Sequence, residues 1–195
     1  MEDIPRRRLF TIEDWERLVE ARIFPEYEQL ELIRGELITL APVRDPQLQL
    51  LRRRQAACVR GLNRYFSLRL KLQAVVDVRS FILLWEQQSE PQSDLSLLRT
   101  REDFYATLTP KPEDILLVVE VAGSSLLYDR DTKIPLYAEA GIPESWLVDL
   151  KSGTLFVYRR PSAEGYQDVR PYRRGESVAP EAFPDVRFTL DEILG

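Results

Sequence analysis

The most regular hydrophobic pattern of the chain lies between Pro46 and Leu72. Apolar side chains recur there every three or four residues, which is the spacing of one face of an α-helix. The members of this face are Leu48, Leu51, Cys58, Val59, Leu62, Tyr65 and Phe66. A second helix is predicted from Thr11 to about Ile23, because Thr11 can cap the first turn and Asp14 lies within that turn.

Short apolar segments predict the strands of a sheet. Residues 29–33 and 36–40 flank the dipeptide Arg34-Gly35, an arrangement typical of a β-hairpin. Residues 115–121 are apolar on both faces apart from Glu120, as expected for a buried central strand. The other predicted strands are 74–77, 81–85, 95–98, 145–150 and 154–158, of which the last two form a second hairpin.

A helix is expected after the central strand, ending near Ala140, where a glycine follows as a stop signal. Pro135 lies inside this segment. Either the regular helix begins near Asp131 and Pro135 falls in or near its first turn, or the helix is kinked. A short helix over 190–194 closes the chain, and no repeat or linker interrupts the order. The sequence therefore predicts one α/β domain over residues 1–195.

Histidine and cysteine, which many catalytic sites use, are absent or scarce. The 195 residues include no histidine and one cysteine, Cys58. This composition excludes a Ser-His-Asp or Cys-His nucleophile, a His general base, and a zinc site made of His or several Cys within this chain. Any bound metal must therefore accept oxygen ligands, as Mg²⁺, Mn²⁺ and Ca²⁺ do.

The overall composition is that of an ordinary globular protein, with 44% apolar and 30% charged residues and a net charge of −5. No apolar segment approaches the roughly 20 residues that span a bilayer. We therefore expect no membrane insertion and a cytoplasmic location. The negative charge argues weakly against a protein that coats nucleic acid, but it does not exclude a local basic face.

Two acidic residues lie beside apolar strands, where a carboxylate needs compensation. Glu120 interrupts the central strand, and Asp94 opens the segment 95–98. A buried carboxylate has a large desolvation cost unless a cation, a donor or solvent compensates it. Glu120 could instead end the strand in water or pair with an Arg, and Asp94 alone could be a turn residue. On neighbouring strands, the pair would form a two-carboxylate site suited to Mg²⁺.

The long helix also has an asymmetric charge distribution. Between Pro46 and Leu72 there are seven basic residues and no acidic one. At about 100° per residue, four of them fall within about 20° of one line opposite the apolar face. This basic stripe consists of Arg53, Arg60, Arg64 and Lys71. It could be the solvated back of the helix, but a solvated face normally mixes signs. In an acidic protein it favours an anionic partner such as DNA.

Several motifs together resemble one protein family. They lie at residues 90–94 (EPQSD), 118–125, 128–138 and 140–149, and the block from 118 to 149 is the most specific. From the first hairpin to the C-terminus, the sequence is similar to the Uma-type restriction endonuclease family, abundant in cyanobacteria, of the PD-(D/E)XK nuclease superfamily. The resemblance implies a restriction-endonuclease-like fold, with a mixed central sheet flanked by helices, and cleavage of DNA with Mg²⁺ or Mn²⁺.

The resemblance also implies roles for individual residues. Asp94 and Glu120 match the two acidic metal ligands. Glu31 matches the glutamate of the hairpin, with Glu36 as the weaker candidate. The superfamily lysine usually lies two positions after the second acid, where this chain has an alanine. In this family the lysine is on the following helix, where Lys133 matches it.

The sequence departs from the family at Ser93, which replaces the motif proline, at residues 76–80, and at the start of the long helix, where family members often have a histidine. Two further hypotheses therefore stand beside an active endonuclease. One is a nuclease-fold protein that binds DNA without cleaving it, and the other is a protein-interaction or assembly module. Symmetric cutting of a duplex would favour a homodimer or a higher homo-oligomer.

Overall fold

The computed structural model describes residues 7–25, 28–39 and 45–195. Residue 40 of the predicted first hairpin lies outside this part of the chain. The strands of the main sheet are Val75–Val78 (β3), Leu95–Leu98 (β4), Ile115–Ala122 (β5), Glu144–Asp149 (β6), Thr154–Arg159 (β7) and Asp168–Tyr172 (β8). Two small sheets pair Leu30–Ile33 (β1) with Glu36–Thr39 (β2) and Ser177–Val178 (β9) with Phe188–Thr189 (β10).

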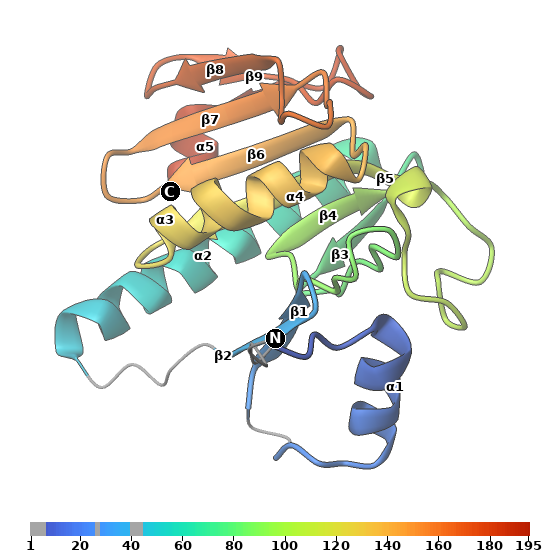
Figure 1. Cartoon of the computed structure of the whole chain (residues 1–195). Helices are drawn as coiled ribbons and strands as arrows, with labels where there is room; N and C mark the ends of the chain where they lie inside the picture. Colours follow the sequence, from blue (N-terminus) through green and yellow to red (C-terminus); the bar gives the residue numbers. More distant parts are fainter. Residues whose placement is uncertain (1–6, 26–27, 40–44) are drawn as a thin grey trace.

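The main sheet is mixed, with the strand order β3-β4-β5-β6-β7-β8. β5 and β6 are parallel, and every other pair of neighbours is antiparallel. Helices cover both faces of this sheet (Figure 1). β5 lies inside the sheet and is buried, as its continuous apolar sequence predicted. The α/β fold with a mixed central sheet flanked by helices is therefore confirmed.

The helices follow the sequence signals closely. α1 spans Ile12–Glu20, and the Thr11 side chain caps it by accepting a hydrogen bond from the Asp14 amide. α2 spans Pro46–Leu70 and buries its apolar face in the larger core cluster, on one side of the sheet. α5 spans Leu190–Leu194, as predicted, and packs against α2. No helix within the described ranges is long and apolar enough to cross a membrane.

The segment after β5 is helical in three successive forms. A short α-turn over Leu126–Tyr128 (α3) leads into a π-helical turn over Asp129–Lys133 (η2), and the regular helix Ile134–Glu139 (α4) follows. Regular helix thus begins at Ile134 rather than near Asp131, with Pro135 in its first turn, where a missing N–H is tolerated. A 3₁₀ turn over Pro112–Asp114 (η1) precedes β5.

The strand predicted over residues 81–85 is wrong. These described residues form isolated bridges, Phe81 with Gln92 and Leu84 with Ser89. Their backbone amides donate instead to loop carbonyls, including Leu83 to Pro110. Ile82 and Leu84 belong to one core cluster and Leu83 to another. Burial on both sides therefore produced a strand-like apolar pattern without a strand partner.

The first hairpin depends on its turn glycine. Arg34 and Gly35 both have positive φ, as a two-residue hairpin turn requires. A Cβ on Gly35 would lie 2.8 Å from the Phe10 carbonyl oxygen, so the N-terminal segment passes directly over the turn. α1 and the hairpin share a small core of Ile12, Trp15, Leu32 and Leu83.

Candidate functional site

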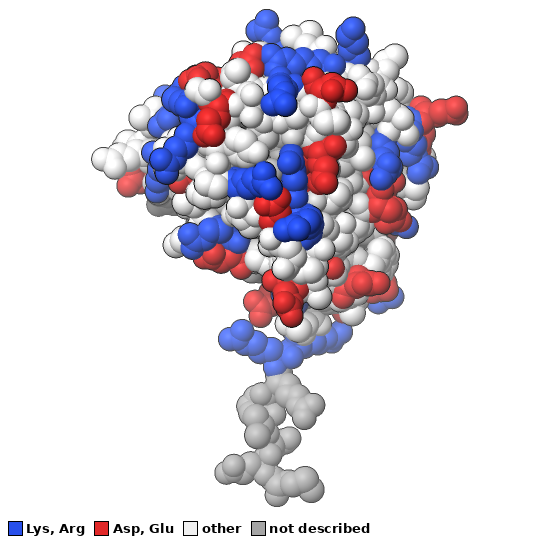
Figure 2. Space-filling view, turned by 90° about the horizontal axis from the view of Figure 1, so that it is seen from above, with Lys and Arg blue, Asp and Glu red and all other residues white. Residues whose placement is uncertain are grey.

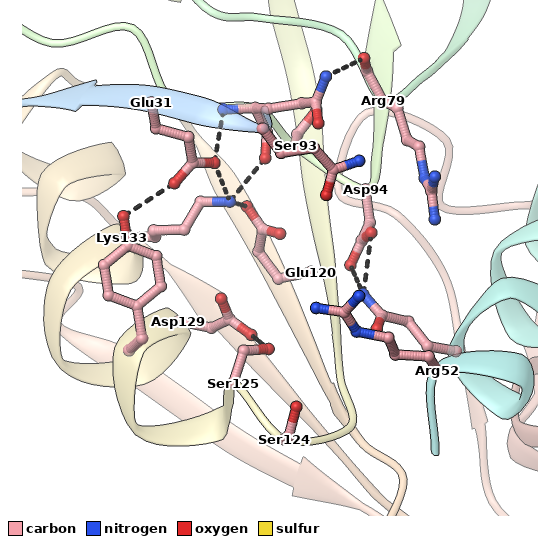
Figure 3. A pocket seen from close by; sticks show the side chains of 14 residues that line it. Glu31, Arg52, Arg79, Ser93, Asp94, Glu120, Ser124, Ser125, Asp129 and Lys133 are labelled. Atoms are coloured by element: carbon pink, nitrogen blue, oxygen red, sulfur yellow. Dashed lines mark hydrogen bonds and ion pairs between the residues drawn. The ribbon is translucent and has the colours of Figure 1, made fainter. Parts of the chain in front are cut away.

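Acidic side chains from separate elements meet in one pocket of about 220 Å³ (Figure 3). Glu31 comes from β1, Asp94 from the residue before β4, and Glu120 from β5. The π-helical turn contributes Asp129 and Lys133. These five residues define the acidic pocket. The pocket is lined by all four catalytic candidates of the sequence analysis, Asp94, Glu120, Lys133 and Glu31. The weaker candidate, Glu36, is exposed and is not among its lining residues.

The pairing of β4 with β5 explains why Asp94 and Glu120 meet. Leu95 lies opposite Val119 in this antiparallel pair, and one further step places Asp94 opposite Glu120. Directly opposite residues point to the same face of a sheet. Asp94 is held by the Val121 amide, which donates to Oδ2 at 2.8 Å, and by Gln55 Nε2, which donates to both carboxylate oxygens at 3.2 and 3.1 Å.

Lys133 is the counter-ion of two carboxylates. The residue is 3% exposed. Its Nζ lies 2.8 Å from Glu120 Oε1 and 3.3 Å from Glu31 Oε1, and it donates to the Gln92 carbonyl oxygen at 2.6 Å. Two ion pairs and one hydrogen bond thus hold the ammonium group between the two carboxylates. Lys133 therefore fixes the positions of Glu31 and Glu120 relative to each other.

Tyrosines on the helical segment complete these contacts. Tyr137, four residues after Lys133 and on the helix face expected from that spacing, donates to Glu120 Oε1 at 2.6 Å. Tyr128 donates to Glu31 Oε2 at 2.8 Å. Glu120 Oε1 thus contacts both Lys133 and Tyr137. The second Glu120 oxygen points away from Lys133, towards the side of the pocket where Asp94 lies (Figure 3).

Burial dominates the protonation equilibria of the pocket. It raises the pKa of Glu120 to about 8, although the Lys133 charge acts in the opposite direction. Burial likewise raises the pKa of Asp129 to about 6, while Lys133 lowers it. For Lys133, burial is the largest single influence and disfavours the charged form, but the acidic groups Glu120, Tyr137, Glu31 and Asp129 together outweigh it and hold the Lys133 pKa well above its usual range. The ammonium is therefore charged at all physiological pH values.

The donors of the acidic pocket fit a hard divalent cation. The described ranges contain no group of three or more His, Cys, Asp or Glu side chains that could together hold a metal ion. Mg²⁺, however, is commonly held by one or two carboxylates, with water and phosphate oxygens completing its shell. Asp94 and Glu120 supply that pair. A cation between them would replace the hydrogen bonds that Gln55 now donates to Asp94.

Sequence reasoning missed Asp129 and Gln55. Asp129 is four residues before Lys133, and this spacing on a helix indicates a common face. It is buried, and Ser125 Oγ donates to its Oδ2 at 2.6 Å. Gln55 is a polar residue on the inward side of α2 between apolar positions, which was an available signal. Arg52 and Arg79 also line the pocket and bring positive charge to it.

The basic stripe is separate from the acidic pocket. Arg53, Arg60 and Arg64 are exposed on α2, whose opposite face packs on the sheet. Lys71 is exposed too, but α2 ends at Leu70 and not at Leu72 as predicted, so Lys71 is its C-cap residue, with a φ of 53°. None of the four is a lining residue of the acidic pocket. Figure 2 shows the molecule from above, on the side of β8 and β9 in Figure 1, with cations and anions side by side. That view does not present a continuous basic surface. The stripe as a DNA contact stays a prediction.

Comparisons with known proteins identify the family through a family model and the fold through a solved structure. A family model described as "Putative restriction endonuclease" (Uma2) matches residues 12–191. The crystal structure of "a putative nuclease belonging to DUF820" from Anabaena variabilis is similar, with a TM-score of 0.65 and 17% sequence identity. The similarity covers 95% of this chain and 97% of that one. At this identity the likeness shows the fold. No curated protein matches the chain.

Proposed function

The chain belongs to the Uma2 family, described as putative restriction endonucleases, and from this premise we propose that it is a metal-dependent endonuclease that hydrolyses phosphodiester bonds of DNA. The observation that carries the proposal is the convergence of Asp94 and Glu120 on one pocket, beside a buried Lys133. Family membership supports nuclease chemistry in general. The metal and the roles of individual residues are our proposal.

In this proposal, Asp94 and Glu120 hold Mg²⁺ or Mn²⁺. The bound ion would polarise the scissile phosphate and lower the pKa of a water molecule. Lys133 holds Glu120 Oε1, so that the second carboxylate oxygen stays turned towards Asp94. Its positive charge also reduces the repulsion between the acidic pocket and an anionic phosphate. Glu31, whose two oxygens are both hydrogen-bonded or ion-paired, positions Lys133.

Two substitutions test the metal site directly. Asp94→Ala and Glu120→Ala should each abolish Mg²⁺- or Mn²⁺-dependent cleavage of plasmid DNA, and calorimetry should show loss of Mn²⁺ binding. Asp185→Ala is the matched control, because Asp185 is an exposed carboxylate outside the pocket. Cleavage that survives both substitutions, in protein purified in parallel, would show that the activity comes from another site or another protein.

The specific alternative is a nuclease-fold protein that binds DNA without cleaving it. The observation that favours it is the Gln55 amide, which already occupies both Asp94 oxygens. Salt-dependent DNA affinity without cleavage at any Mg²⁺ or Mn²⁺ concentration would select this alternative. Absence of both DNA binding and cleavage would select the interaction or assembly module.

We also propose that the basic stripe contacts backbone phosphates outside the cleavage site. Its four members are exposed, and none has an ion pair among the residues that the structure describes. Such contacts act through charge and carry little sequence information.

For symmetric cutting of a duplex, we propose a homodimer or a higher homo-oligomer. Sedimentation of the protein with and without duplex DNA tests the assembly state.

A further inference from the structure

A second cavity, of about 500 Å³, lies between α1 and the first hairpin, directly beside the acidic pocket. The two cavities share three lining residues, Gln29, Glu31 and Gln92. The two cavities are therefore neighbours, and these three residues form their common wall. The volume lies within the range of about 300–1,000 Å³ that is typical of sites for small organic groups.

Aromatic and aliphatic side chains form much of the wall of this second cavity. Trp15 and Val19 come from α1, Phe24 from the segment after α1, and Phe81 from the loop after β3. Trp15 is fixed in place, because its indole Nε1 donates to a Glu90 carboxylate oxygen and its ring lies 6.0 Å from that of Phe24. Trp15 itself is only 5% exposed, so its fixed ring backs the wall, and the half-buried rings of Phe24 and Phe81 supply the aromatic faces for a flat ligand.

The charged residues that line the two cavities differ, so the cavities favour different kinds of ligand. The acidic pocket contains the cations Lys133, Arg52 and Arg79 in addition to its carboxylates. The second cavity has Arg22 as a lining cation and carboxylates on Glu28, Glu31 and Glu90. An anionic phosphate is therefore disfavoured in the second cavity. A neutral planar group that offers N–H donors to a carboxylate is favoured there.

We propose that the second cavity, here called the base pocket, binds one unstacked nucleobase of a DNA strand whose phosphate lies at Asp94 and Glu120. This inference rests on the proposed function. Aromatic side chains bind extruded bases by stacking, and polar side chains read the exposed base edge. The preferred substrate would then be DNA with an unpaired nucleotide at the cleavage site, such as a bulge or a single strand, and not a fully paired duplex.

Filling the base pocket tests the inference. Val19 is 53% exposed, so Val19→Trp places a large ring in the cavity without replacing a core residue. Val169→Trp is the matched control, because Val169 on β8 is 47% exposed and lies outside both cavities. Affinity is measured by fluorescence anisotropy, with Ca²⁺ in place of Mg²⁺, for a paired duplex, the same duplex with one extrahelical adenine, and the single strand.

The wild type should bind the bulged duplex about tenfold more tightly than the paired one, as expected for one stacked base. Val19→Trp should remove this preference, and Val169→Trp should keep it. If Val19→Trp lowers the melting temperature, Phe81→Ala takes its place, because this variant removes one aromatic side chain of the wall. It is judged by the same ratio of the affinities for the bulged and the paired duplex.

Equal wild-type affinity for the paired and bulged duplexes, or an unchanged preference in the pocket variants, would overturn the base pocket alone. Failure of the wild type to bind any of the three DNAs would overturn the proposed function together with it. A preference that disappears in the pocket variants and persists in the control supports the inference even if no cleavage is observed.

Discussion

Replacing Lys133 by methionine would leave the buried carboxylates of Glu31 and Glu120 without their counter-ion. The methionine retains most of the side-chain volume, so the substitution mainly removes charge. Nζ lies 2.8 Å from Glu120 Oε1 and 3.3 Å from Glu31 Oε1. At an effective dielectric constant of 20, these separations correspond to gross attractions of about 6 and 5 kcal/mol.

The net effect on stability is smaller, because the folded protein also loses the desolvation cost of the ammonium. Removing one partner of a buried ion pair typically costs about 3–5 kcal/mol. For a domain of 195 residues, this corresponds to a decrease in melting temperature of about 6–20 °C. An exposed cation provides the control: Lys151→Met should change the unfolding free energy by less than about 0.5 kcal/mol.

The loss of folding stability caused by Lys133→Met should depend on pH, and its direction follows from the pKa of Glu120. Burial raises the pKa of Glu120 to about 8 from an ordinary value of 4.5, and removal of Lys133 raises it further. The folded state then binds more protons than the unfolded state above pH 4.5. Stability therefore falls as pH rises through this window, and Lys133→Met should lose more stability at pH 9 than at pH 5.

Urea denaturation in EDTA at pH 5 and pH 9 measures these differences, and Glu120→Gln provides the second arm of a double-mutant cycle. The amide cannot ionise, so Lys133→Met should cost less in the Glu120→Gln background, with a coupling of roughly 0.5–3 kcal/mol. An equal loss in both backgrounds and at both pH values would refute the assignment of Lys133 as the counter-ion of Glu120.

Three further predictions follow from the same structure. Mn²⁺ affinity, measured by calorimetry, should rise with pH through about 8, because a cation requires the ionised form of Glu120; a flat profile from pH 6 to pH 9 would contradict this. Replacing Arg60 and Arg64 by Gln should flatten the log–log salt slope of duplex DNA binding by about 1.8, with Ca²⁺ present; an unchanged slope would make the stripe a solvated helix face. Gly35→Ala should lower the unfolding free energy by more than about 1 kcal/mol, since its φ is +77° and the new Cβ would lie 2.8 Å from the Phe10 oxygen; unchanged urea denaturation would contradict that prediction.

Features that depend on local sequence or on one periodicity could be predicted without the structure. The apolar face of α2 has helical spacing, and β5 is apolar on both faces because the sheet buries it completely. The turn at Gly35 and the cap at Thr11 follow from the chemistry of single residues. The lack of histidine already restricts the site to oxygen and amine chemistry. The pair Asp94 and Glu120 was recognisable because a carboxylate beside an apolar strand needs compensation.

The tertiary structure alone decided which of these groups meet and in what charge state. Residues 81–85 have a strand-like pattern but no strand partner, because periodicity reports burial and not pairing. Asp129 and Gln55 reach the pocket through the π-helical turn and the docking of α2 on the sheet. The pKa of Glu120 depends on how much water the surrounding elements exclude. The meeting of these groups and their charge states arise from the register of strands and the packing of helices that are distant in sequence, which local patterns do not specify.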